Sequence, residues 1–236
     1  MNFIVSTKQR TDKEEIMDDF SIGGDLLRDT LDKLENINRW LGGNRVTLKG
    51  LKSILKNHPK EQEVTIIDIG CGHGDILRDI AKFGRKNNYT FKLIGVDANP
   101  TAIQYANELS VDYTELSFKT EDIFSDEFQK REFDVVLATL FLHHFKEPEL
   151  ISFLRNTIKK AKIGVVVNDL HRHKLAYYLF MLLSIFIKNK MIIEDGLTSV
   201  LRGFKRQDLE RISNKINKKS QISWKWAFRF LWIIKK

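Results

Sequence analysis

The stretch from Val64 to Asp75, Val-Thr-Ile-Ile-Asp-Ile-Gly-Cys-Gly-His-Gly-Asp, constrains the fold more than any other part of the chain. Its β-branched run predicts a buried strand, and glycine at alternate positions predicts a tight turn that exposes the backbone. Apolar residues at helical spacing begin directly afterwards, at Ile76 and Leu77. A strand, a glycine-rich loop and a helix in this order hold an adenosine-type ligand at the edge of a parallel sheet.

This segment resembles motif I of the class I S-adenosylmethionine-dependent methyltransferases. The resemblance extends through Asp97, Asp122 and residues 134–145, the middle third of the chain. The resemblance implies S-adenosylmethionine as cofactor. It also implies that the glycines let the backbone approach the cofactor, and that the motif acid organises the loop near the amino-acid end of the cofactor. Position 75 is Asp, which distinguishes the motif from the Gly-x-Gly-x-x-Gly of dinucleotide binding. The matching positions are Asp68, Gly70, Cys71, Gly72 and Gly74.

Length and composition predict one α/β domain with an appended piece. The chain has 236 residues, of which 42% are hydrophobic, so a sizeable core can form. Its single cysteine excludes a disulfide framework and favours a reducing compartment. Residues 1–12 lack the apolar region of a signal peptide, and the apolar run Leu175–Ile187 is shorter than the roughly 20 residues of a membrane span. We therefore expect a cytoplasmic protein that is soluble or peripheral.

Charge is unevenly distributed. The net charge is +8, but residues 150–236 hold 19 Lys and Arg against 5 Asp and Glu, whereas residues 1–149 hold 20 against 26. A basic surface is compatible with solvent, with nucleic acid or with anionic lipid. We expect no nucleic-acid partner because no RNA-binding module is recognisable, although an RNA methyltransferase remains the alternative. Weak association with a membrane surface also stays open, and the oligomeric state is not predicted.

Strand and helix patterns alternate along the core, which predicts a parallel sheet with helices on both faces. A hairpin near Ala227 predicts two final strands, one of them antiparallel. With the family resemblance, we expect a Rossmann-like, doubly wound, mostly parallel seven-stranded sheet with an antiparallel C-terminal strand. The strands are expected at 64–69, 91–97, 116–120, 133–138 and 163–168, and the helices at 75–87, 100–109, 147–160 and 205–217.

Residues 1–60 show helical patterns, with Asp25 as the expected N-cap of the first helix. In related methyltransferases such an extension forms a lid, so we divide the chain into a lid segment, 1–60, and a cofactor-binding domain, 61–236. The resemblance places Arg39 near the cofactor carboxylate. The alternative is that Arg39 and Trp40 only pack this segment down.

Asp97 ends the second expected strand, 23 residues after Gly74. A carboxylate at this spacing can accept both ribose hydroxyls, so we assign Asp97 and the adjacent Ala98 to the cofactor site. The segment with Asp122 and Ile123 resembles the part of the family that contacts adenine.

The fourth strand runs into Thr139, Leu140 and the pair His143-His144. The resemblance implies that this end of the sheet faces the methyl group, with Thr139 and Leu140 beside the cofactor. An Asn/Asp-Pro-Pro-aromatic motif, frequent in nucleic-acid and protein-amide N-methyltransferases, is absent here. The Leu-His-His-Phe sequence instead resembles enzymes acting on quinones, phenols and other small molecules. One of the histidines is a candidate base for a hydroxyl nucleophile; alternatively, one caps the next helix and the other packs beside the cofactor.

The fifth strand ends in Asn168-Asp169 and continues to Arg172. These residues, with Arg202, are expected to line the substrate pocket or to hold this edge together. Asp169-x-His171-x-His173 has a metal-ligand pattern, but the fourth strand supplies no partner acid, so we expect no metal.

An insertion at 170–204 occupies the place where the family builds its substrate cover. Its apolar run, Leu175–Ile187, predicts a buried helix, with a membrane-surface helix as the alternative. A loop is expected from Glu194 to Arg202. The complete pattern predicts O-methylation of a small, apolar, aromatic, polyketide or quinone-like acceptor, with C-methylation as an alternative.

Overall fold

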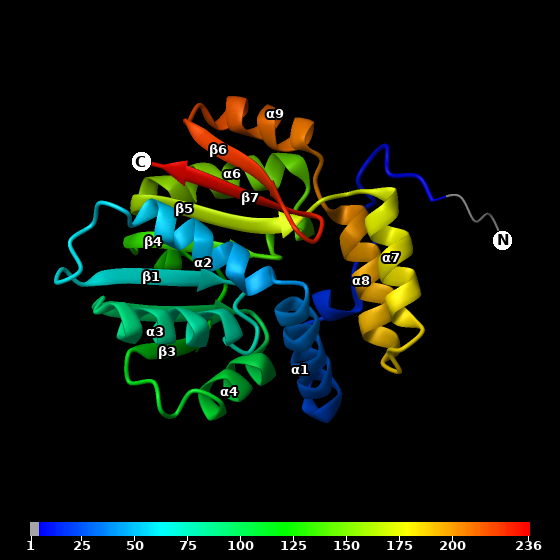
Figure 1. The fold of residues 1–236 in the computed structure, drawn as a ribbon, viewed down its shortest axis with the longest axis horizontal. Coiled ribbons are helices and arrows are strands. Elements are labelled where there is room, and N and C mark those ends of the chain that lie inside the picture. The colour runs from blue at the N-terminus through cyan, green and yellow to red at the C-terminus, as the bar shows by residue number, and fades with distance from the viewer. Residues whose placement is uncertain (1–4) are drawn as a thin grey trace.

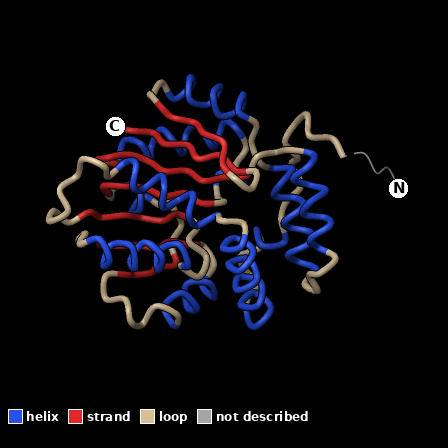
Figure 2. The backbone as a smooth tube through the Cα atoms, viewed as in Figure 1, coloured by secondary structure: helices blue, strands red, loops and turns tan. Residues whose placement is uncertain are grey.

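The computed structural model describes residues 5–236, and seven of its strands form one sheet in the order β3-β2-β1-β4-β5-β7-β6 (Figures 1 and 2). The strands are parallel except for β7, which is antiparallel to both of its neighbours. This confirms the predicted fold class and the C-terminal hairpin. The strands are β1 (Val64–Ile69), β2 (Phe91–Asp97), β3 (Leu116–Thr120), β4 (Phe133–Thr139), β5 (Ala161–Leu170), β6 (Ser220–Lys225) and β7 (Arg229–Lys235).

Helices cover both faces of the sheet because its central strands carry apolar side chains on both sides. Ile66 and Ile67 on β1 point to opposite faces, and both are fully buried. One face packs against α2 (Gly43–Ile54), α3 (Asp75–Asn87) and α4 (Pro100–Glu108). The other packs against α5 (Asp126–Gln129), α6 (Glu147–Lys160) and α9 (Arg206–Ile216).

The remaining helical elements lie beyond the carboxyl ends of the parallel strands (Figure 1). They are η1 (Ile16–Asp18), α1 (Gly24–Trp40), η2 (Leu142–His144), α7 (Lys174–Ser184) and α8 (Lys190–Arg202). The strand order reverses between β1 and β4, and ligands of open α/β sheets bind at such a switch point. Two helices of the expected lid segment, 1–60, differ in position: α1 stands over this edge, whereas α2 packs against β5 and β7 (Figure 1).

Three local expectations were wrong. Gly23, not Asp25, is the N-cap of α1, and Asp25 lies in the first turn. The segment from Glu194 to Arg202, expected as a loop, belongs to α8, whose Asn189 side chain caps the first turn. The helix α7 is not buried: of its residues only Ala176 is buried, while Leu182 is 58% exposed and the following Phe186 is 82% exposed.

Candidate cofactor and acceptor site

The glycine-rich loop connects β1 to α3 at the switch point. Gly70, Gly72 and Gly74 all have positive φ, at 70°, 53° and 79°, a conformation that side chains strongly disfavour. A Cβ on Gly70 would also lie 2.3 Å from the Phe141 ring. Cys71 between them is buried, and burial raises the pKa of its thiol, which stays neutral. The chain therefore has the backbone-exposing turn that the motif predicts.

Asp97 binds this loop from the end of β2. Its Oδ2 accepts the Gly72 N–H at 2.9 Å, and its Oδ1 accepts the Asn99 N–H at 2.9 Å. A carboxylate offers about four lone pairs, and the Ala98 N–H is a further donor to it, so Asp97 retains room for at least one more hydrogen bond. Ala98 follows directly, and the Asn99 side chain caps α4, whose first residue is Pro100. Asp97 thus joins the glycine loop to the end of β2, and its contact with a ribose stays a prediction.

Two more carboxyl groups surround the loop. Asp68 is buried, and its Oδ1 has no hydrogen-bond partner among the described residues. Burial, together with the carboxylates of Asp75 and Asp97, raises the pKa of Asp68 well above its usual range. Asp75 accepts a hydrogen bond from Asn44 Nδ2 at 2.9 Å. An unpartnered buried oxygen within an acidic cluster favours a ligand that carries positive charge or N–H donors, and S-adenosylmethionine fits both descriptions.

The loop after β3 is joined to Asp97, because the Glu121 N–H donates to the Asp97 carbonyl at 3.0 Å. Ile123 is buried, as an apolar neighbour of an adenine ring would be. The Asp122 side chain is exposed, and its Oδ1 accepts the Phe124 N–H at 2.9 Å. The structure therefore places this pair at the carboxyl ends of the parallel strands, with Asp122 closing its own turn, and the adenine contact stays a prediction.

Thr139 and Leu140 lie at the carboxyl end of β4. Thr139 Oγ1 is 3.0 Å from Thr47 Oγ1 on α2. Leu140 has a φ of 52°, and its N–H donates to the Asn168 carbonyl at 2.8 Å. The positive φ turns the chain sharply here and directs it into η2, where both candidate histidines lie.

His143 is 2% exposed and bridges two carboxylates. Its Nδ1 is 2.7 Å from Asp169 Oδ1, and its Nε2 is 3.4 Å from Glu15 Oε1. Burial alone would lower the pKa of His143, but Asp169 and Glu15 outweigh burial and raise this pKa to about 9. The alternative expectation, in which a histidine caps the next helix, was wrong because Lys146 is the N-cap of α6.

His144 lies beside His143, with ring centroids 4.3 Å apart, and is held from outside the sheet. Its Nδ1 is 2.6 Å from Asp18 Oδ1. Arg202 on α8 forms an ion pair with Asp18 and donates to the His144 carbonyl at 2.7 Å and the His143 carbonyl at 3.3 Å. Arg202 therefore fixes the backbone of the histidine turn.

The residues on and after β5 were expected either to line the substrate pocket or to hold this sheet edge together. Asn168 and Arg172 do the latter. Asn168 is fully buried and donates to the Gly43 carbonyl and to Thr47 Oγ1, both at 3.0 Å. Arg172 is also buried and donates to the Thr7 carbonyl at 3.1 Å and to Asp208 at 2.9 Å. Of Asn168, Asp169 and Arg172, only Asp169 contacts the ring of His143, the candidate base.

Arg39 forms ion pairs with two acidic side chains, and its place near the cofactor carboxylate stays a prediction. Its Nε is 2.9 Å from Glu35 and its Nη2 is 3.3 Å from Asp79 on α3. The adjacent Trp40 is 76% exposed, so it does not pack the segment down as the alternative supposed. Arg39 lines a hollow of about 260 Å³ with Gly42, Asn44, Arg45 and Asp79.

Residues 5–18 supply contacts that the sequence analysis missed, and we call them the N-terminal strap. Glu15 meets His143, Asp18 meets His144, and Arg10 Nη2 donates to the His143 carbonyl at 2.6 Å. Asp195 on α8 accepts the backbone N–H groups of Ile16 and Met17 at 2.6 and 3.0 Å. No periodic pattern marks these residues, so the sequence gives no signal that would bring them to the site.

The metal pattern expected to be empty, Asp169-x-His171-x-His173, does not converge on one point: Asp169 faces His143, while His171 packs against Phe230. Glu15, His143 and His144 each place one ligand-type atom within 4.8 Å of the others. Asp169 and Asp18 already engage one nitrogen of each ring. That the protein uses no metal stays a prediction.

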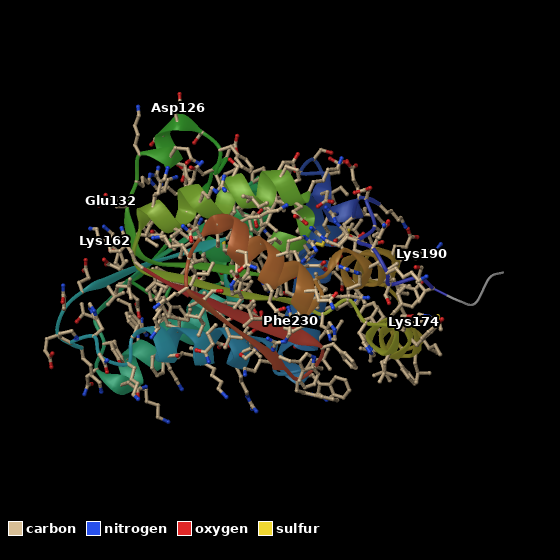
Figure 3. All side chains as sticks on the ribbon, turned by 90° about the horizontal axis from the view of Figure 1, so that it is seen from above. Asp126, Glu132, Lys162, Lys174, Lys190 and Phe230 are labelled. Carbon is tan, nitrogen blue, oxygen red and sulfur yellow. The ribbon has the colours of Figure 1, made fainter. Side chains whose placement is uncertain are left out.

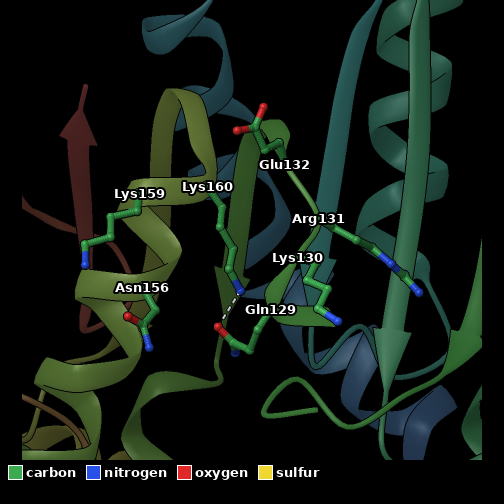
Figure 4. A pocket seen from close by; sticks show the side chains of 7 residues that line it. All are labelled: Gln129, Lys130, Arg131, Glu132, Asn156, Lys159 and Lys160. Atoms are coloured by element: carbon green, nitrogen blue, oxygen red, sulfur yellow. Dashed lines mark hydrogen bonds between the residues drawn. The ribbon is translucent and has the colours of Figure 1, made fainter. Parts of the chain in front are cut away.

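A hollow of about 310 Å³ lies at the opposite end of the sheet (Figure 4). Figure 3 shows two residues of this end, Glu132 and Lys162, far from Lys174 at the end that carries the candidate site. Lys160 Nζ donates to Gln129 Oε1 there at 2.6 Å, and Arg131 pairs with Glu121. Because ligands of such sheets bind at the carboxyl ends of the strands, we do not assign the cofactor to this hollow.

The fold and the loop geometry define a Rossmann-like protein with a nucleoside-type site, and the sequence assigns its family. Residues 60–177 match the family model of a methyltransferase domain, and the chain belongs to this family. This confirms the predicted family. The solved plantazolicin methyltransferase BpumL with SAH has a similar fold, with a TM-score of 0.65, 19% identity and 89% of each chain covered.

Two curated relatives share parts of the chain. A Methanocaldococcus jannaschii protein, provisionally named as a protein N5-glutamine methyltransferase, is 30% identical over 53% of this chain and 61% of its own. The 2-methyl-6-phytyl-1,4-hydroquinone methyltransferase of Synechocystis is 27% identical over 44% of this chain and 30% of its own. The chain thus spans less than two thirds of the length of either relative.

Proposed function

We propose that the protein transfers a methyl group from S-adenosylmethionine to a hydroxyl of a small, mostly apolar acceptor of phenolic, polyketide or quinone type. One juxtaposition carries this proposal: the glycine loop and Asp97 lie at the same sheet edge as the buried pair of His143 and Asp169. Membership of the methyltransferase family and the acidic cluster around Asp68 support the cofactor. The hydroquinone methyltransferase among the relatives supports the acceptor class.

When bound, the cofactor supplies a methyl group that its sulfonium has already activated. The residues of the chain then have to bind and orient the cofactor and the acceptor, and to remove the proton from the acceptor hydroxyl. The loop and Asp97 orient the nucleoside, and Asp169 holds His143 so that Nε2 is available to the acceptor hydroxyl. Glu15 lies 3.4 Å from Nε2 and, with Asp169, keeps His143 protonated at neutral pH. His143 can therefore take the acceptor's proton only after it has lost its own, which we expect when the acceptor displaces Glu15.

Labelled S-adenosylmethionine, offered with a panel of phenols and quinones, tests the proposal. Mass spectrometry and NMR of the product locate the methyl group. A label on oxygen supports the proposal, whereas a label on ring carbon supports the second candidate, C-methylation. The fold shared with the CurJ carbon methyltransferase, at a TM-score of 0.60, favours this second candidate. Transfer to RNA or protein amides alone would refute both. The missing Asn/Asp-Pro-Pro-aromatic motif after β4 argues against amide methylation.

We also propose that α7 rests on an anionic membrane surface and collects apolar acceptors there. Figures 1 and 2 place α7 at the margin of the molecule, outside α8. Between Asp169 and Glu194 the chain has no acidic residue, and the exposed Lys174, Lys188 and Lys190 flank the apolar run Leu175–Ile187. Exposed apolar residues with basic flanks are typical of interfacial helices. The exposed apolar side chains are Leu175, Leu179, Met181, Leu182, Ile185 and Phe186.

No helix within residues 5–236 is both long and apolar enough to cross a bilayer, so any such contact is peripheral. Flotation with phosphatidylcholine vesicles, with and without phosphatidylglycerol, tests it. We expect binding only to the anionic vesicles, and loss of binding in the Leu182→Asp/Phe186→Asp variant. Val111→Asp is the matched control, since Val111 is 78% exposed at the end of α4. If the wild type does not bind vesicles but forms a dimer, and Leu182→Asp/Phe186→Asp abolishes this dimer, α7 would be a self-association surface instead.

A further inference from the structure

Arg229 is a buried cation that forms no ion pair with any described carboxylate, although the charge of the buried Asp169 acts on it. It begins β7, opposite Leu170 at the end of β5, and is only 3% exposed. Its Nη2 donates to Asn38 Oδ1 on α1 at 2.7 Å, while Nε and Nη1 have no hydrogen-bond partner. Within residues 5–236, no carboxylate lies at ion-pair distance from this guanidinium. Burial lowers the pKa of Arg229 to about 10, so the side chain stays charged at neutral pH.

Such an arrangement is costly, because a buried charge is normally paired and its N–H groups are normally satisfied. The surroundings are also shaped to admit this side chain. A Cβ on Gly43 would lie 3.0 Å from the Arg229 Cζ, so glycine there makes room for the guanidinium. Asn168, which binds the same Gly43 through its amide nitrogen, leaves its own Oδ1 unpartnered. Unsatisfied polar groups from β5 and β7 thus gather around one point at the sheet edge that carries the candidate site.

Arg39, which the family resemblance assigns to a carboxylate, already pairs with Glu35 and Asp79. Arg229 has no such partner and lies closer to the strand ends. We propose that the Arg229 guanidinium, through Nε and Nη1, binds an anionic oxygen of a ligand, a carboxylate or a phenolate. This inference rests on the proposed function, because the anionic oxygen comes either from the cofactor's amino-acid carboxylate or from a phenolic acceptor. A phenolic acceptor offers it as an ionised hydroxyl or as a carboxylate such as that of 4-hydroxybenzoate. Arginine suits the task because its planar fork binds a carboxylate through two parallel hydrogen bonds.

Calorimetric titration of the full chain with two nucleosides shows whether the anionic oxygen that Arg229 binds comes from the cofactor or from the acceptor. S-adenosylhomocysteine carries the carboxylate, whereas 5′-methylthioadenosine lacks the whole amino-acid end. If Arg229 binds the cofactor, Arg229→Gln should lower the affinity for S-adenosylhomocysteine by about tenfold or more. The affinity for methylthioadenosine should stay unchanged. If it binds the acceptor, both nucleosides should keep their affinity. The same variant should then weaken 4-hydroxybenzoate, but not neutral 4-methylphenol, on the protein saturated with S-adenosylhomocysteine.

Arg155→Gln, at an exposed arginine on α6, is the control and should leave all four affinities within about twofold, whereas Arg229→Lys should recover part of the loss. Thermal unfolding without ligand checks for a purely structural role. Arg229 forms no ion pair with a described carboxylate, and Asp169 keeps its bonds to His143, so the variant should unfold close to the wild-type temperature. The proposal is overturned if the wild type binds neither S-adenosylhomocysteine nor 4-hydroxybenzoate, if Arg229→Gln leaves every affinity unchanged, or if it weakens both nucleosides equally. Discrimination between the nucleosides without methyl transfer would sustain this inference and refute only the proposed reaction.

Discussion

His143 Nδ1 lies 2.7 Å from Asp169 Oδ1, and this bond joins the turn after β4 to the end of β5. Asp169 also accepts the backbone N–H of His143 at 3.1 Å, so one carboxylate fixes both the ring and the main chain. A proton held at Nδ1 leaves Nε2 as the reactive nitrogen. The geometry resembles the orienting half of a catalytic triad, in which a buried acid sets the tautomer of the base.

Asp169→Asn should therefore reduce turnover more than cofactor affinity. The amide keeps the shape but loses the charge that orients and stabilises a protonated His143, so we expect kcat to fall by about 10²- to 10⁴-fold. The affinity for S-adenosylhomocysteine should stay within about twofold. Steady-state kinetics and calorimetry measure the two quantities. Full turnover in His143→Ala, in His144→Ala and in the double variant would exclude both histidines as the base.

Stability should decline between neutral and alkaline pH because of His143. Its pKa rises from an ordinary value near 6.5 to about 9 in the folded protein, so the folded state holds an extra proton between these values. The stabilisation is complete below pH 6.5, on the order of 3 kcal/mol, and is lost as the pH rises through about 9. His171, whose pKa burial lowers to about 4, acts below this window and with the opposite sign. Denaturant unfolding at several pH values should show the decline, and His143→Gln should flatten it.

Asp97→Ala should weaken cofactor binding by about tenfold or more. The substitution removes the proposed acceptor of the ribose hydroxyls and releases the Gly72 N–H from its bond at 2.9 Å. Asp112→Ala, at an exposed carboxylate beyond α4, is the control and should bind S-adenosylhomocysteine like the wild type. An unchanged calorimetric affinity in a folded Asp97→Ala protein would contradict the ribose assignment.

Local pattern was sufficient for the parts of the fold that local physics determines. The strands at 64–69, 91–97 and 116–120 and the helices at 75–87 and 147–160 occupy the predicted residues. Alternating β-branched runs and helical periodicity encode these elements directly. The glycine loop was predictable for the same reason, since the positive φ of its three glycines follows from their spacing.

Contacts between segments distant in sequence were not predictable. Arg39 is on the expected helix, but Glu35, one turn before it, and Asp79 on α3 engage its guanidinium. Whether α7 is buried depended on which neighbours cover it: Phe180 packs against Gly196 of α8, while the opposite side has no cover among the described residues. The partners of His143 come from positions 15 and 169, and no periodicity connects either position to it.

Glu15→Gln should shift the pH dependence of the reaction toward lower pH. The Glu15 carboxylate, 3.4 Å from His143 Nε2, favours the protonated ring and occupies the position an acceptor hydroxyl needs. The neutral amide should lower the pKa of His143, so the rising limb of kcat/KM, which reports deprotonation of the base, should appear at lower pH. Glu14→Gln is the control, because Glu14 is exposed on the same strap. The pH profile of kcat reports the enzyme–acceptor complex instead. A kcat limb that stays in place in Glu15→Gln, while Asp169→Asn moves it, would show that the strap leaves the base when the acceptor binds. A limb that neither variant moves would remove His143 from the proton transfer.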